Sequence, residues 1–383
     1  MQEIKKNKKF PICNTKQKRS YLKNKNSRKY KLKEWEISME TEVGAIFEQG
    51  RGSIKIPMPI YIKASASVVG TKEGEGPFGE LYDIVGKDDK FGCDTWEEAE
   101  STLQKEALTL AIGKSGMKKE EISYLFAGDL LGQSIASSFG LGAFEIPLVG
   151  MYGACSTCGL TMAMATIVLA GGMAQYAACV TSSHFASAEK EFRFPLGYGN
   201  QRPLSATWTV TGSGAFVLSS SKGTADRALV AGITLGKLVD YGLKDSMNMG
   251  ACMAPAAADT IYRNLVDFGR NPEDYDKIIT GDLGSVGQKV LWDLMREKGM
   301  DISGVHMDCG MEIYDSSQDA HAGGSGCGCS AVVLSAYILK QLEEGIWKRI
   351  LFVPTGALLS KTSFNEGQSI PGIAHALELV SPK

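Results

Sequence analysis

The chain has 383 residues, of which 44% are hydrophobic, and a formal net charge of −2. It exceeds the ~250–300 residues at which single hydrophobic cores stop growing, which favours two fused units. The charge is uneven. Residues 1–33 hold 13 Lys and Arg against one acid, so the remaining 28 Lys and Arg against 42 Asp and Glu leave the body at −14. An acidic body argues against nucleic acid as a partner.

Residues 1–38 form a basic tail without apolar periodicity, a composition typical of disorder. One interpretation is a basic arm for anionic lipid or nucleic acid. The other is translated upstream sequence ahead of a true start at Met39. The second is favoured, because nothing after Met39 needs the tail. The tail also lacks the apolar core of a signal peptide.

The first half, residues 50–222, alternates strands with helices. A strand pair broken by prolines comes first, then a helix with a Thr95–Glu98 capping box, and then further strands with a long polar segment between the last two. The predicted elements are strands at 54–66, 125–128, 146–151, 177–181 and 210–219, and helices at 95–112 and 158–170.

Cys155 lies in a tight Gly-Ala-Cys-Ser-Thr turn between the strand at 146–151, which we expect to be buried, and an apolar helix. Backbone N–H groups at a helix start favour an anion, so this position favours a thiolate. The alternative is a small apolar residue at a crowded turn. The combination of strand, small-residue turn and helix is that of a nucleophile elbow and predicts a ligand or substrate site.

The second half, residues 223–383, repeats the first. Both halves contain a strand ending in Gly-Asp-Leu, at Asp129 and Asp282, and these aspartates are expected mainly to cap helix starts. Cys155 precedes Thr181 by 26 residues, and Cys329 precedes Thr355 by the same number. The predicted elements are strands at 229–235, 278–280 and 349–355, and helices at 255–268, 286–298 and 331–344, with an insertion at 307–320. Two such halves predict an α/β fold with mostly parallel sheets.

Many ordered segments of residues 56–375 resemble the stage V sporulation protein AD family, within the thiolase fold. The resemblance is carried by AGDLL (127–131), YGACST (152–157), TSSHFASAEKEFRFPLGYGNQRP (181–203), TVTGSGA (209–215), ACMAPAAADTI (251–261), TGDLGSVG (280–287), AGGSGCGCSAVV (322–333) and TGALLS (355–360). It implies two pseudo-duplicated β-α-β-α-β halves in an α-β-α-β-α sandwich.

The resemblance also implies a function. Proteins of this family take part in moving dipicolinic acid, with Ca²⁺, into the developing endospore. The chain is then expected to bind dipicolinic acid without catalysis and without a cofactor. It would act as a homodimer, peripheral to the inner spore membrane, with membrane subunits of its operon as partners. The alternatives are a Cys155-dependent acyltransferase of the thiolase or ketoacyl synthase type, and a scaffold of the membrane complex.

The residues around Cys155 argue against acyl transfer. Where condensing enzymes of this fold carry a catalytic His, the chain has Asp282, and the segment that usually offers Asn reads Gly326-Cys327-Gly328. An ionised Asp would repel a thiolate and an oxyanion. His184 follows a neighbouring strand and is the remaining candidate base for Cys155, but a catalytic pair of the two is disfavoured. His184 and Asp282 are instead expected among the residues of the ligand site.

A planar aromatic dianion needs cationic forks, N–H donors and a flat face. Arg193 and Arg202 flank an aromatic segment and are candidates, each with a solvated basic loop as the alternative. A turn at Gly212-Ser213-Gly would let a ligand approach the backbone closely. The alternative is that these residues form a β-bulge without a role in binding. Cys327 and Cys329 open the second apolar helix, whose N-terminus would converge with that of Cys155 on the anion.

The cysteine pairs Cys155–Cys158 and Cys327–Cys329 invite a metal or redox interpretation. Structural zinc takes its ligands mostly from loops, whereas these pairs begin apolar helices. A redox disulfide would need an exposure that a buried helix denies. No metal is therefore expected among the site residues.

Overall fold

The structure is a computed structural model that describes residue 50 and residues 52–192 and 201–383. The expected basic tail at 1–38 and Arg193 lie outside these residues. The strands are β1 (Ser53–Val69), β2 (Ile84–Val85), β3 (Tyr124–Gly128), β4 (Leu148–Gly150), β5 (Tyr176–Ser183), β6 (Trp208–Thr209), β7 (Gly212–Ser219), β8 (Ala228–Thr234), β9 (Lys277–Thr280), β10 (His306–Asp308), β11 (Gly324–Ser325), β12 (Arg349–Val353), β13 (Thr355–Ala357), β14 (Gly372–Ala374) and β15 (Ala376–Val380).

The main sheet confirms the predicted duplication. Its order is β10-β9-β12-β15-β8-β1-β7-β5-β3-β4, with β2 beside β1. From its outer edge inward, the first half has the order β4-β3-β5-β7-β1 and the second half the order β10-β9-β12-β15-β8. If the five strands of each half are numbered in chain order, both halves read third, second, fourth, fifth, first. The pairing directions also agree, with two parallel ladders followed by two antiparallel ones. The halves join where β1 pairs antiparallel with β8.

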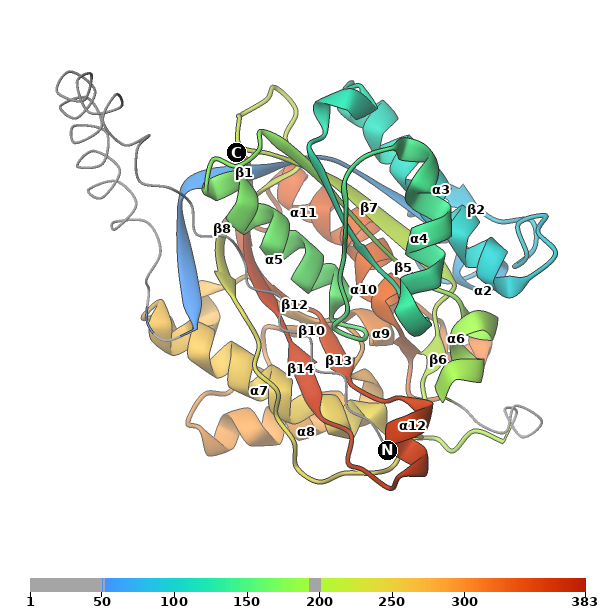
Figure 1. Cartoon of the computed structure of the whole chain (residues 1–383). Helices are drawn as coiled ribbons and strands as arrows, with labels where there is room; N and C mark the ends of the chain where they lie inside the picture. The colour runs from blue at the N-terminus through green and yellow to red at the C-terminus, as the bar shows by residue number, and fades with distance from the viewer. Residues whose placement is uncertain (1–49, 51, 193–200) are drawn as a thin grey trace, which may run out of the picture. The chain divides into compact units, whose positions relative to one another are not determined.

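Helices cover both faces of each half of this sheet (Figure 1). They are α2 (Thr71–Gly74), α3 (Trp96–Ser115), α4 (Ile135–Leu141), α5 (Thr157–Ala170), α6 (Phe185–Phe192), α7 (Met249–Asp267), α8 (Gly284–Glu297), α9 (Cys309–Glu312), α10 (Cys327–Val333), the π-helical turn η8 (Leu334–Ile338), α11 (Leu339–Glu344) and α12 (Lys361–Asn365). The 3₁₀ turns are η1 (Gly79–Leu81), η2 (Lys119–Glu121), η3 (Gly132–Ser134), η4 (Gly142–Phe144), η6 (Pro272–Asp274) and η7 (Ser316–Gln318).

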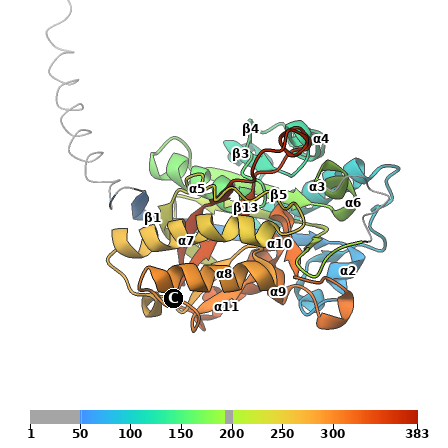
Figure 2. The same ribbon diagram turned by 90° about the horizontal axis from the view of Figure 1, so that it is seen from below.

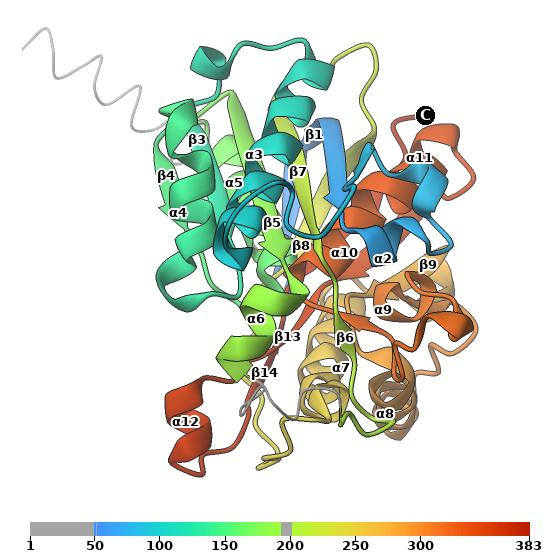
Figure 3. The same cartoon turned by 90° about the vertical axis from the view of Figure 1, so that its right-hand side faces the viewer.

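Three separate cores show that the elements form five layers. The central core packs α5, α10 and α11 between the two halves of the sheet. A second core lies under α7 and α8, and a third under α3. Successive side chains of a strand point to opposite faces of the sheet and so enter different cores. In β9, Ile278 faces the α7–α8 core and Ile279 faces the central core. Figures 2 and 3 show α7 and α8 on one side and α3 away from them, with α10 between them.

Most helix and strand predictions are confirmed, the capping box among them. The Glu98 N–H donates to the Thr95 hydroxyl, and the Thr95 N–H donates to the Glu98 carboxylate. Several predictions differ from the structure. The main sheet is mixed and not mostly parallel, because parallel and antiparallel ladders are equally frequent in it. The expected strand pair is one strand, β1, whose pairing with β8 shifts register between Lys55 and Ile60, where the prolines need no ladder partner. Helix α7 begins at Met249, because Asn248 caps it, so Pro255 lies inside the helix. The segment after Ser183 forms α6.

The expected glycine-rich turn at Gly212 and Ser213 is also wrong. Both residues lie within β7, which pairs without interruption with β5 over its whole length. The Ser213 hydroxyl donates to the Thr181 carbonyl, 3.1 Å away. A Cβ on Gly214 would lie 2.8 Å from the backbone carbon of Ala331 in α10. These glycines therefore let the central helix approach the sheet, and they form neither a ligand turn nor a bulge.

The helices of the described residues include none that combines the length and the apolar character needed to cross a bilayer.

Candidate functional site

The turn that carries Cys155 is held by its own hydrogen bonds. The Thr157 hydroxyl accepts from the Gly153 N–H and donates to the Ala154 carbonyl, and the Ser156 hydroxyl donates to the Gly153 carbonyl. Ala154 has a φ of +48°, a conformation that an L-residue adopts only under constraint. The chain then enters α5 at Thr157. The strained strand–turn–helix arrangement confirms the predicted elbow.

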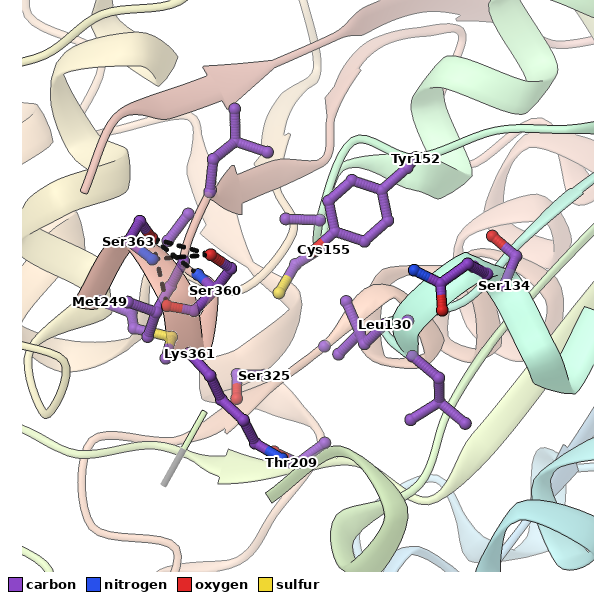
Figure 4. Close-up of a pocket in the computed structure, with 18 residues that line it drawn as sticks. Leu130, Ser134, Tyr152, Cys155, Thr209, Met249, Ser325, Ser360, Lys361 and Ser363 are labelled. Atoms are coloured by element: carbon purple, nitrogen blue, oxygen red, sulfur yellow. Dashed lines mark hydrogen bonds between the residues drawn. The ribbon is translucent and has the colours of Figure 1, made fainter. Parts of the chain in front are cut away.

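Cys155 lies in the wall of a cavity of about 490 Å³, within the range of small-molecule sites. Figure 4 shows its sulfur directed into the space between Leu130, Ser325 and the start of α12. Five segments from both halves meet here: the loop after β3, the Cys155 turn, the β6–β11 ladder, the start of α7, and the β13–α12 connection. The lining residues are Leu130, Leu131, Gly132, Gln133, Ser134, Tyr152, Ala154, Cys155, Thr209, Met249, Ser325, Gly326, Ala357, Leu358, Leu359, Ser360, Lys361 and Ser363.

Asp282 lies directly behind this wall and ties three segments together. One carboxylate oxygen accepts the N–H of Gly326 at 2.9 Å, and the other accepts the hydroxyl of Thr355 at 2.7 Å. The side chain also forms a hydrogen bond with the Cys155 thiol. Burial raises the pKa of Asp282 to about 7. The expectation of a fully ionised Asp282 is therefore wrong, since at neutral pH its ionised and protonated forms are both populated.

The Cys155 thiol is not the expected thiolate. Its exposed fraction is 7%, and burial raises its pKa well above the usual range. The negative charge of Asp282 adds to that rise. The position before α5 does favour an anion, but the loss of hydration and the neighbouring carboxylate outweigh the helix dipole. Cys155 is a protonated thiol at neutral pH.

The two aspartates of the repeat differ in role. Asp129 accepts the N–H of Ser137 in the first turn of α4 at 2.9 Å, which confirms the expected capping. Asp282 does not cap α8. That role belongs to Asp308, whose carboxylate accepts the N–H groups of Leu283 and Gly284 at 2.9 and 3.0 Å. Asp282 is thus left to bond Gly326 and Thr355 beside the cavity.

The second cysteine pair does not repeat the placement of Cys155. Cys327 and Cys329 both lie in the first turn of α10, whereas Cys155 precedes α5. Helix α10 begins at Cys327, because Gly326 adopts a φ of +104° before it. The Cys327 thiol donates to the Ser182 carbonyl at 2.8 Å, and the side chain packs with Cys155 and Leu130. Cys329 lies in the central core and away from the cavity wall. The N-terminus of α10 still reaches the cavity, through Gly326.

His184 has both ring nitrogens occupied elsewhere. Nδ1 accepts the N–H of Ala186 at 3.1 Å, so Nε2 is the protonated nitrogen and donates to the Asp89 carbonyl at 2.7 Å. Burial lowers the pKa of His184, which keeps the ring neutral. The residues that line the cavity, all within the described part of the chain, include no histidine. The structure therefore does not bring His184 to Cys155 as a base.

The remaining predicted residues lie away from the cavity wall. Arg202 donates to the carbonyl and carboxylate of Asp319 at 2.9 and 3.1 Å, and its guanidinium lies 4.8 Å from the centre of the Trp208 ring. Gly212 and Ser213 are buried in β7. Within residues 50, 52–192 and 201–383, no group of three or more His, Cys, Asp or Glu side chains is placed to hold a metal ion.

The connection from β13 to α12 supplies Lys361 and two hydroxyl groups to the cavity, and the sequence-based prediction did not include it. Ser360 caps α12 by accepting the N–H of Ser363 at 3.1 Å. The sequence does contain a signal for this segment. A Ser-x-x-Ser spacing, typical of a helix N-terminus, follows the predicted strand at 349–355, and a lysine lies between the two serines. Lys361 is the cation among the described lining residues.

Several solved structures share this fold. The chain aligns with 3-oxoacyl-[acyl-carrier-protein] synthase III from Aquifex aeolicus (12% identity, 84% of this chain and 99% of that one, TM-score 0.51) and with the C143A form of OleA from Xanthomonas campestris (15% identity, 88% and 98%, TM-score 0.54). It also aligns with AbyA1, a tetronic acid condensing enzyme (14% identity, 83% and 99%, TM-score 0.53). Identities this low establish the fold alone, and they confirm the thiolase-like α/β architecture.

Comparison with proteins of similar sequence identifies the family of the chain. Stage V sporulation protein AD of Bacillus subtilis (strain 168) is 43% identical over 319 residues, which is 83% of this chain and 94% of that protein. Residues 50–380 match the family model described as stage V sporulation protein AD (SpoVAD). The match spans both halves of the fold and every segment of the Cys155 cavity. The chain therefore belongs to the stage V sporulation protein AD family.

Proposed function

We propose that this sporulation protein binds dipicolinic acid in the Cys155 cavity and takes part in its uptake, with Ca²⁺, into the developing spore. Family membership makes it a sporulation protein. The observation that carries the choice of binding over catalysis is the state of Cys155. Its thiol is buried, protonated and hydrogen bonded to a carboxyl group where a condensing enzyme needs an activated nucleophile.

The cavity wall suits a small planar anion. Leu130, Met249 and Tyr152 offer apolar surface to a ring. Lys361 contributes a positive charge to the same wall. The hydroxyls of Ser325 and Ser360 add polar surface, and they donate to the Trp208 carbonyl and to the Ser363 hydroxyl. An apolar pocket with a few placed polar groups is the usual form of a small-molecule site. This arrangement favours an aromatic carboxylate.

Calorimetric titration tests the proposal. Dipicolinate should bind saturably, and picolinate, which has one carboxylate fewer, should bind about ten- to hundredfold more weakly, because a charge-assisted hydrogen bond contributes roughly 1.5–3 kcal/mol. Benzoate controls for ring stacking. Equal binding of dipicolinate and picolinate, or no binding of either, would contradict the proposal.

A second candidate, acyl transfer through Cys155, is favoured by one observation, the strained turn that presents this cysteine to the cavity. Incubation with acetyl- or acetoacetyl-coenzyme A followed by intact-mass measurement separates the two. A stoichiometric thioester on Cys155 would support the enzyme, and an unmodified chain would support the binding protein.

The proposed location is the surface of the inner spore membrane, with docking on membrane subunits of the same operon. This follows from a transport role together with the lack of a membrane-crossing helix in the described residues. Carbonate or high-salt washing should release the protein from spore membranes, and a strain without those subunits should leave it soluble. Retention through both treatments would contradict peripheral docking. A pure scaffold would dock in the same way but would not bind dipicolinate.

A homodimer is proposed through the edge of the first half-sheet. Strand β4 pairs with β3 alone among the described strands, and its Leu148 and Val149 are 42% and 38% exposed. This strand was expected to be buried. Phe139 of α4 is 77% exposed. An exposed apolar edge strand is a ready partner for a second copy. Light scattering should give the mass of a dimer, and a monomer at micromolar concentration would contradict this.

A further inference from the structure

Asp282 is a buried carboxyl group with no cation beside it in the part of the chain that the structure describes. Its exposed fraction is 1%, and no Lys, Arg or His of the described residues forms an ion pair with it. The titratable groups that face it are thiols and one carboxyl group. They are Cys155 before α5, Cys327 and Cys329 of α10, Cys309 of α9 and Asp308 of β10. None of these groups can neutralise a carboxylate.

Asp282 also forms hydrogen bonds with residues that line the cavity. Gly326, whose N–H it accepts, and Cys155, whose thiol it contacts, are both lining residues. A bound dianion would bring two further negative charges close to this carboxylate in a site of low dielectric. Like charges in such a site do not stay fully ionised, and one group takes up a proton.

We propose that ligand binding in the Cys155 cavity is coupled to protonation of Asp282, so that up to one proton from solvent enters the site with each dianionic ligand. This inference rests on the proposed function. The dianion enters with its carboxylates ionised, and the proton is held on the protein. Asp282 thereby sets the preferred charge state of the occupied site.

The hydrogen bonds around Asp282 accept this proton without rearrangement of the backbone. Oδ2 must stay an acceptor, because the Gly326 N–H points at it. Oδ1 faces the Thr355 hydroxyl at 2.7 Å, and a hydroxyl can reverse from donor to acceptor. The proton therefore belongs on Oδ1, donated to Thr355. The raised pKa of Asp282, about 7, places the free protein near the transition at neutral pH.

The test is calorimetric titration of dipicolinate in two buffers of different ionisation enthalpy. At pH 8 the free carboxyl group is mostly ionised, so the wild-type protein should take up about 0.9 proton per ligand. Its affinity should fall by up to about tenfold per pH unit between pH 7.5 and 9. Asp282→Asn should take up none, should bind with an affinity independent of pH, and at pH 8.5 should bind at least as tightly as wild type.

Two further variants test whether Asp282 is the group that takes up the proton. Thr355→Val removes the donor that stabilises the carboxylate, so Asp282 is already protonated in the free protein and proton uptake should fall at pH 8. Asp129→Asn changes the equivalent aspartate of the first half, which is also buried and precedes the lining residue Leu130. It should keep the wild-type proton uptake.

Two outcomes would overturn the inference. One is dipicolinate binding by the wild-type protein without proton uptake, which leaves the proposed function intact. The other is uptake that persists in Asp282→Asn and disappears in Asp129→Asn, which would assign the proton to the Asp129 network. Absence of dipicolinate binding at every pH would refute the proposed function together with this inference.

Discussion

Replacing Cys155 with tryptophan should abolish dipicolinate binding while the protein stays folded. The side chain points into the cavity, so an indole at this position would occupy the ligand's space without displacing the central core. Cys155→Ala should weaken binding by less than about tenfold, because a thiol is a weak hydrogen-bond donor. Calorimetric titration measures both effects, and circular dichroism confirms the fold.

The pair of variants separates shape from chemistry at this position. If the thiol itself supplied an essential contact to the ligand, alanine would be as damaging as tryptophan. Retention of binding in both variants would contradict the placement of the ligand against Cys155, and loss in both would contradict a minor role for the thiol. Cys158→Ala is a matched control. Cys158 lies in α5 and points into the central core, so its replacement should leave dipicolinate binding unchanged.

Gly214→Val should destabilise the protein strongly, by about 3 kcal/mol, the upper part of the usual range for overpacked cores. A Cβ at this position would lie 2.7 Å from the Ala331 Cβ and 2.9 Å from the Ala331 carbonyl oxygen. The backbones of β7 and α10 would have to separate, and α10 carries Cys327 next to the cavity. Urea unfolding should show the loss as a lower midpoint.

Gly113→Ala is the control for this prediction. Gly113 lies in α3, and a Cβ there would meet no atom within 4 Å. Alanine costs less conformational entropy in a helix, so stability should rise by roughly 0.5–1 kcal/mol. Equal effects of the two substitutions would show that close packing of α10 on β7 is not what requires glycine at position 214.

The duplicated topology was predictable because its signals are local. Apolar strands, the Thr95–Glu98 capping box and the repeated Gly-Asp-Leu motif each report on a few neighbouring residues. The elbow at Cys155 was predictable for the same reason, since its hydrogen bonds span only residues 153–157.

The chemistry of the site depends on contacts between distant segments and could not be predicted in this way. Asp282 meets Gly326 across 44 residues and Thr355 across 73, and burial there sets the charge states of Asp282 and Cys155. The pattern Gly-Ser-Gly at 212–214 is typical of turns, but only the packing of α10 shows that it is a strand. Lys361 reaches the cavity through the β13–β14 hairpin, which no local pattern links to Cys155.

A crystal structure of the protein grown with dipicolinate tests the central claim most directly. The account predicts the ligand in the cavity between Gly326, Cys155 and the β13–α12 connection, with its ring against the apolar wall and no covalent bond to the Cys155 sulfur. Ligand seated at Arg202 and Trp208 with the Cys155 cavity unoccupied would contradict the account, as would density continuous with the sulfur of Cys155.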